Sequence, residues 1–179
     1  MPIERMIRAV KLDPSVYDEL EADRNATTEA FMVVTAVAFI SGLGGFLSGI
    51  RNPGGAIAGL IAAVIFAVIG WVVWSYITYW IGTSLFHGTA TPGELLRTLG
   101  FAYVPNALGF FSFIPVLGGL AAFIGGIWAL IAGVIAVRQA LDFDTGKALI
   151  TVIIGWLVMM AIGLVLAVLG VGSAMMFGR

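Results

Sequence analysis

The side chains that most often perform chemistry in enzymes are scarce in this sequence. It contains no cysteine and a single histidine, His87, which excludes a cysteine nucleophile and a cluster of histidine metal ligands within one chain. A serine or threonine nucleophile needs a general base beside it, and His87 lies in a short polar stretch next to Gly88. The sequence therefore predicts a protein that is not an enzyme and has no catalytic residue, no metal ligand and no cofactor.

The stretch GFAYVPNALGFFSFIPVLGG, residues 100–119, holds the residues that could form a non-catalytic site. Pro105 bends a helix because it lacks a backbone N–H, and this frees a carbonyl about one turn earlier. Asn106 carries an amide that needs a hydrogen-bond partner in an apolar environment. Two interpretations stay open for Tyr103, Pro105 and Asn106, namely a hinge or small-ligand site and a static kink.

The composition shows which solvent surrounds these residues. The chain of 179 residues is 60% hydrophobic and 11% charged, with a mean hydropathy of +1.06, whereas soluble domains are about 45–50% apolar and about 25% charged. We therefore expect an all-α integral membrane protein, because helices satisfy every backbone polar group in lipid. An amphipathic region over 1–28 precedes a five-helix transmembrane bundle over 29–175. The predicted spans are about 30–50, 56–86, 94–114, 117–140 and 148–173.

Two local signals mark where helices begin. Thr91 and Glu94 have the spacing of a capping box, and Pro92 falls at the first helical position. Asp13 is a candidate N-cap for a second helix that starts at Pro14. Both signals predict a helix start after a polar break.

The first residues predict one or two amphipathic helices. The apolar residues that recur with helical spacing are Ile3, Met6, Ile7 and Val10. Arg5, Arg8 and Lys11 lie among them, a pattern typical of a helix on a membrane surface. The alternative is that the apolar stripe packs on the protein's own helices.

Small residues recur four positions apart in several spans. Such rows let helix backbones approach closely in lipid, and they are candidates for helix-packing interfaces either within the chain or with a partner subunit. The residues concerned are Gly45, Gly49, Gly55, Gly59, Gly125, Ala129 and Gly133.

The basic residues indicate an orientation. With five spans, Arg51 and Arg179 fall on one side of the membrane, and all other basic residues fall on the opposite side. The positive-inside rule then predicts a protein of the inner (plasma) membrane with a cytoplasmic N-terminus and an external C-terminus. The basic residues on the predicted cytoplasmic side are Arg5, Arg8, Lys11, Arg24, Arg97, Arg138 and Lys147.

The pattern resembles the Yip family, the multi-pass membrane proteins named for interaction with Ypt/Rab GTPases, in its short prokaryotic form. The segments that carry the resemblance are LLRTLGFAYVPNALGF, with its aromatic–x–Pro element at Tyr103 and Pro105, and IWALIAGVIAVRQALDFDTGKALITVIIGWLV. The resemblance implies a five-helix bundle and a role in membrane organisation or trafficking complexes. The acidic DLYGP-type motif of eukaryotic members is missing from this sequence, so GTPase binding is doubtful.

These features together predict a non-enzymatic scaffold or accessory protein. We expect it to pack against other membrane protein subunits or against itself, or to organise the lipid bilayer. The net charge of −1 gives no footprint for nucleic acid. The alternative function is a small-solute or lipid transporter that uses the kinked third span.

Overall fold

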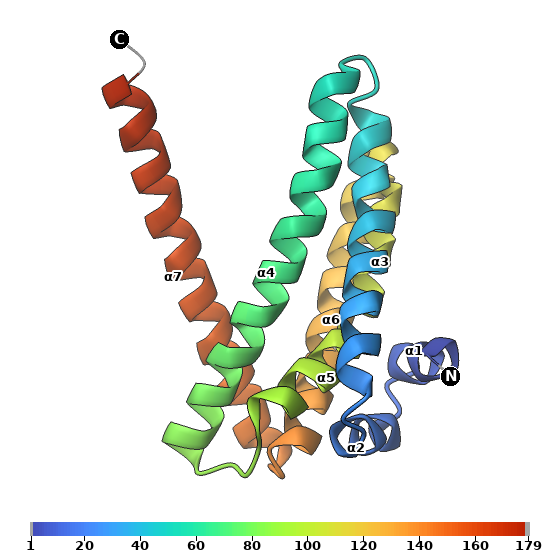
Figure 1. Cartoon of the computed structure of the whole chain (residues 1–179), viewed down its shortest axis with the longest axis vertical. Helices are drawn as coiled ribbons and strands as arrows, with labels where there is room; N and C mark the ends of the chain where they lie inside the picture. Colours follow the sequence, from blue (N-terminus) through green and yellow to red (C-terminus); the bar gives the residue numbers. More distant parts are fainter. Residues whose placement is uncertain (1, 178–179) are drawn as a thin grey trace.

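The computed structural model describes residues 2–177, with side chains described for residues 2–165, 167 and 168. Within this part of the chain every regular element is a helix (Figure 1). The elements are α1 (Pro2–Val10), α2 (Pro14–Ala22), α3 (Ala26–Ser48), α4 (Pro53–Phe86), α5 (Pro92–Ala102), the 3₁₀ helix η1 (Val104–Phe113), α6 (Leu117–Ala140) and α7 (Thr145–Phe177).

Four of these helices are long and apolar enough to cross a membrane, namely α3, α4, α6 and the stretch Thr145–Val165 of α7. Helix α4 has 34 residues, which at 1.5 Å per residue make about 51 Å, well beyond the roughly 30 Å of a hydrocarbon core. The helices α3, α4 and α6 stand side by side, and α7 diverges from α4 away from the end that holds α2 (Figure 1). The all-helical class is confirmed, and a helix long and apolar enough to cross a membrane occupies each of these four predicted segments.

The third predicted span, about 94–114, is not one bent helix. The α-helix α5 ends at Ala102, and the ten-residue 3₁₀ helix η1 begins at Val104. Pro105 lies in the first turn of η1, where its missing N–H leaves no broken bond. The break predicted at Pro105 is therefore present as a change of helix type, and the segment continues from the α2 end along α3 (Figure 1).

The predicted helix starts are confirmed in atomic detail. The Thr91 side chain accepts from the backbone N–H of Glu94, and the Glu94 carboxylate accepts from the N–H of Thr91, at 3.4 and 2.9 Å. Asp13 caps α2 by accepting from the N–H of Ser15 at 3.0 Å. These contacts satisfy N–H groups that have no partner inside the helix.

The apolar core lies where α2, α3, α5 and α6 meet, near one end of the bundle. Its largest fully buried side chains include Tyr17, Leu20, Leu95, Phe101 and Val137. Away from this core the outer faces of the long helices are apolar and exposed. On α4 the exposed stripe is Ile57, Ile61 and Ile65, a pattern expected where lipid is the solvent.

Candidate functional site

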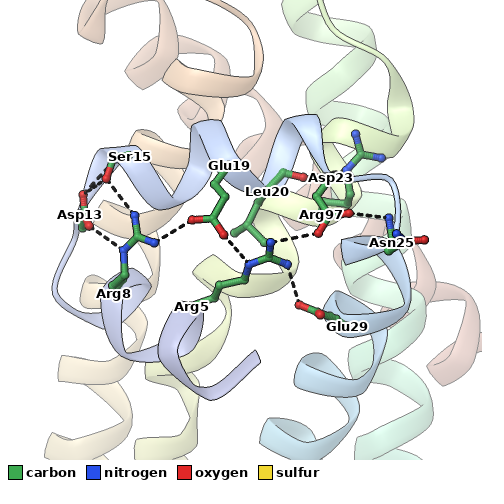
Figure 2. Close-up of polar contacts among 10 residues, drawn as sticks. All are labelled: Arg5, Arg8, Asp13, Ser15, Glu19, Leu20, Asp23, Asn25, Glu29 and Arg97. Carbon is green, nitrogen blue, oxygen red and sulfur yellow. Dashed lines mark hydrogen bonds and ion pairs between the residues drawn. The ribbon is translucent and has the colours of Figure 1, made fainter. Parts of the chain in front are cut away.

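Helix α1 is held to α2 and α3 by a cluster of ion pairs centred on Arg5 (Figure 2). The Arg5 guanidinium lies 2.9 Å from Glu19, 3.0 Å from Asp23 and 2.9 Å from Glu29. Burial opposes the charge of Arg5, but the hydrogen bonds to the three carboxylates outweigh it and raise the pKa of Arg5. One side chain of α1 therefore bridges α2 and the first turn of α3.

Arg8 makes the second half of the same cluster. Its Nε donates to Asp13 at 2.9 Å, one Nη donates to Glu19 at 2.8 Å and the other donates to the Ser15 hydroxyl at 2.9 Å (Figure 2). These bonds lower the pKa of Glu19, while the bonds from Ser15 and then Arg8 lower the pKa of Asp13. Together Arg5 and Arg8 fix α1 by their bonds to acidic side chains of the same chain.

The predicted membrane-surface residues thus have different surroundings. Arg5 and Arg8 face the carboxylates of α2 and α3, and Lys11 is exposed. Of the apolar stripe, Ile3 is 71% exposed and Ile7 is 51% exposed. The apolar edge of α1 is therefore open to the surroundings, and its role at the membrane surface stays a prediction.

Arg97 of α5 contacts the C-terminal end of α2. It is only 6% exposed, its Nε donates to the carbonyl O of Leu20 at 2.9 Å, and an Nη donates to the carbonyl O of Glu21. The last carbonyls of a helix lack intrahelical partners and carry its negative end, so Arg97 caps α2. From the sequence, Arg97 was named only as a basic residue on the predicted cytoplasmic side. An arginine between the leucines of LLRTLG could also have indicated a hydrogen-bonding role.

The Tyr103–Asn106 segment forms a compact turn at the start of η1. The Asn106 Nδ2 donates to the carbonyl O of Tyr103 at 3.0 Å, and the Asn106 backbone N–H donates to the same carbonyl at 3.0 Å. The amide therefore finds a partner inside its own turn. The sequence predicted that this amide needs a hydrogen-bond partner, and the carbonyl of Tyr103 is that partner.

Tyr103 and Asn106 line a cavity of about 420 Å³ between α4, the α5–η1 segment, α6 and α7, here called the α4–α7 cavity. Its aromatic wall is formed by Trp71, Trp74 and Trp156. Ala129 and Gly133 of the predicted small-residue row line it from α6, where their size leaves the space open. The rim side chains Phe66, Leu130 and Trp156 are 71%, 44% and 53% exposed, so the cavity opens at the lateral surface.

A second cavity, of about 610 Å³, lies between α3, α4 and η1 and is here called the α3–α4 cavity. Its lining includes the small residues Gly45, Gly49, Gly55 and Gly59. Ser41, Asn52 and Ser112 supply polar atoms, and Tyr103 lines this cavity as well as the α4–α7 cavity. The structure thus brings Tyr103, Asn106 and most of the small residues to two adjoining cavities, whereas Pro105 and Gly125 line neither of them.

The predicted small residues differ in how closely neighbours approach them. A Cβ at Gly125 would lie 2.7 Å from the carbonyl O of Pro105, and one at Gly49 would lie 3.4 Å from the Ala56 Cβ. At Gly45 and Gly59 nothing lies within 4 Å of such a Cβ. Gly125 therefore serves close packing of α6 on η1, while Gly45 and Gly59 leave open space.

Two tight positions were not singled out in the sequence. A Cβ at Gly44 would lie 2.2 Å from the carbonyl O of Phe110, and one at Gly109 would lie 2.1 Å from the Ser41 Oγ. Both glycines therefore let η1 lie against α3. Their spacing from other glycines does not predict this packing, because the residue that excludes a side chain at each position is distant in the sequence.

The polar contacts described so far join helices of the same chain. Among residues 2–177, no group of three or more His, Asp or Glu side chains is placed to hold a metal ion. His87 is the C-cap of α4, in the left-handed conformation with φ of 57°. The arrangement binds helices together and lines apolar cavities.

Spanning helices, exposed apolar flanks and laterally open cavities define a multi-pass membrane protein. A family model described as the Yip1 domain matches residues 10–175, which is most of the chain. The chain therefore belongs to the Yip1 domain family, as its resemblance to the Yip family indicated. Comparisons with curated proteins and with solved structures give no match.

Proposed function

We propose that the chain is a non-enzymatic scaffold or accessory protein that packs against other membrane proteins or organises lipid. The observation that carries this proposal is the large uncharged lateral surface, which combines the exposed flank Ile57, Ile61 and Ile65 with two open cavities. In lipid, helices associate through close packing of such surfaces. Membership of the Yip1 domain family agrees with this role.

The proposed topology has five crossings, with α5 and η1 together forming the third. Helices α1 and α2 lie at the same end of the bundle as the loops after α4 and α6, and the loop after α3 lies at the other end (Figure 1). All predicted cytoplasmic basic residues fall at the first end by this arrangement. The positive-inside rule then supports a cytoplasmic N-terminus in the plasma membrane, with α1 and α2 as interfacial helices.

The test is purification in several mild detergents with mass spectrometry of the chains that co-purify. A tagged multi-pass protein of similar size, expressed at the same level, is the matched control. We expect specific partner chains or a defined homo-oligomer that the control lacks. A monomer with no chain beyond the control set in every detergent would contradict the packing role.

The cavities favour a second candidate function, transport of a small solute or lipid. The observation that favours transport is that Tyr103 lines both cavities, so that its side chain lies between the α3–α4 cavity and the α4–α7 cavity. Flux into proteoliposomes would be compared for the wild type, Pro105→Ala and Asn106→Ala. No flux above empty liposomes in any of the three would remove this candidate.

A further inference from the structure

We propose that the α4–α7 cavity holds an acyl chain of a bilayer phospholipid and that Tyr103 closes it off from the α3–α4 cavity. This inference rests on the lipid-organising part of the proposed function and gives it a site. The proposed lipid site is the interior of the α4–α7 cavity, and it does not depend on which proteins pack on the outer surface.

The two cavities lie along one face of α4. Gly59 and Ala63 line the α3–α4 cavity, Gly70 and Trp74 line the α4–α7 cavity, and Ala67 lines both. These positions recur every three or four residues, which is the spacing of one helix face. Ala67 lies near the middle of α4, so each cavity occupies one half of the helix and the two meet at Ala67 and Tyr103.

The lining chemistry selects an aliphatic occupant. Among the described residues that line the two cavities, none is Asp, Glu, Lys, Arg or His. In the α4–α7 cavity, polar side-chain atoms come from Tyr103, Asn106 and the indole N–H groups, and the Trp71 indole already donates to the carbonyl O of Leu96 at 3.0 Å. A water molecule needs two to four polar partners, so most of this space suits hydrocarbon better than water.

The position of the cavity opening indicates where such a hydrocarbon chain comes from. The cavity opens between the spanning helices α4, α6 and α7, at the exposed side chains Phe66, Leu130 and Trp156. The medium at this lateral opening is the acyl region of the bilayer. An acyl chain therefore enters without crossing water, while its charged headgroup stays at the interface.

The size of the cavity disfavours a protein helix as the occupant. One turn of an α-helix with its side chains fills roughly 400–600 Å³, so a cavity of about 420 Å³ has room for about one turn. An acyl chain is a much thinner and flexible cylinder that can follow an irregular wall. The volume also lies within the roughly 300–1,000 Å³ typical of small-molecule sites.

The test uses the full chain in nanodiscs that contain a phosphatidylethanolamine with a photoactivatable diazirine at the end of one acyl chain. Cross-linked peptides are mapped by mass spectrometry with and without an excess of the unlabelled lipid. We expect labelling at residues 66–74 and 99–106 that the unlabelled lipid suppresses. Labelling at the exposed stripe Ile57, Ile61 and Ile65 should be weaker and not saturable.

A matched pair of variants makes the test specific. Gly70 and Gly163 both have nothing within 4 Å of an added Cβ, but only Gly70 lines the cavity. Gly70→Leu should fold, fill the cavity and lower its labelling to the level of the exposed stripe, and Gly163→Leu should leave it unchanged. Equal labelling in the two variants, or cavity labelling that is never suppressed by unlabelled lipid, would overturn the site.

Tyr103 is tested by Tyr103→Ala, which joins the two cavities. Labelling from the α4–α7 cavity should then extend to residues 59–63, and lipids with longer chains should compete better than they do with the wild type. An unchanged map and an unchanged chain-length preference would overturn the closing role of Tyr103. Co-purification of partner chains with Gly70→Leu separates this inference from the packing role, because the variant leaves the outer flank intact.

Discussion

Arg97 donates a hydrogen bond of 2.9 Å to the backbone carbonyl of Leu20, 77 residues away in the sequence. The bond joins the start of the broken α5–η1 segment to the C-terminal turn of α2. Since α2 also receives Arg5 and Arg8 from α1, the N-terminal helices and the segment that carries Tyr103 belong to one connected structure. Movement at either part would strain the other.

The first prediction concerns this buried arginine. Arg97→Ala leaves carbonyls of α2 without their donor in a buried place, and hydrogen bonds to charged groups contribute about 1.5–3 kcal/mol each. We expect the free energy of unfolding in detergent to fall by about 2–4 kcal/mol. The control is Arg24→Ala, at an exposed arginine. This variant should change the free energy of unfolding by less than about 0.5 kcal/mol. Equal stability of the two variants would contradict the capping role of Arg97.

The second prediction concerns acid release of α1. The pKa values of Asp13, Glu19 and Asp23 are lowered by their hydrogen bonds, first to Ser15, Arg8 and Arg5 respectively. A lowered carboxyl pKa gives stability that is complete above the unfolded pKa of about 4 and is lost as the pH falls through the folded pKa. Hydrogen exchange of residues 2–10, corrected for the intrinsic rate, should therefore rise below about pH 4.

The control for acid release is Arg5→Gln, which removes the central cation. Its α1 amides should exchange fast already at neutral pH, with a smaller further rise in acid. If α1 of this variant stayed as protected as that of the wild type, the ion pairs would not be what holds α1.

The sequence was sufficient for features that local residues determine. Hydropathy placed α3, α4, α6 and α7, because a run of apolar residues long enough to span lipid has few other uses. The capping box at Thr91 and the N-cap at Asp13 were also found, because both partners of each contact lie within three residues.

Features that depend on distant residues were not predictable. The helix η1 packs closely against Gly44 of α3 and Gly125 of α6, and no local pattern encodes these contacts. The pairing of Arg5 with Glu29 spans 24 residues and shows only when α1 is folded back. The α4–α7 cavity depends on the divergence of α7 from α4 (Figure 1), and that divergence is a property of the assembled bundle.

The third prediction concerns Glu21 at the C-terminal end of α2. Burial, followed by the charges of Asp142, Glu94 and Asp18, raises its pKa to about 7. A raised carboxyl pKa favours the protonated form in the folded state, so the folded state loses stability as the pH rises from about 4.3, the unfolded value, towards 7. Glu21→Gln should therefore increase the unfolding free energy more at pH 8 than at pH 5. A gain that is the same at both values would show that the charge of Glu21 is not the cause.

The fourth prediction concerns topology. Lys11 and Arg51 are both exposed, and the loops that hold them, after α1 and after α3, lie at opposite ends of the bundle (Figure 1). The natural chain has no cysteine. On intact cells an impermeant thiol reagent should label Arg51→Cys but not Lys11→Cys, and both should react after the membrane is opened. Labelling of Lys11→Cys alone on intact cells would reverse the proposed orientation.

The last prediction compares two adjacent glycines of α3. A Cβ at Gly44 would lie 2.2 Å from the carbonyl O of Phe110 and 2.5 Å from the Ser112 Oγ, whereas nothing lies within 4 Å of one at Gly45. Gly44→Ala should lower the unfolding free energy by about 1–3 kcal/mol, the usual cost of overpacking. Gly45→Ala should be neutral or stabilise by up to about 1 kcal/mol, because alanine favours the helix. Thermal unfolding in detergent, followed by tryptophan fluorescence, measures both, and a Gly44→Ala variant as stable as Gly45→Ala would contradict the close packing of η1 on α3.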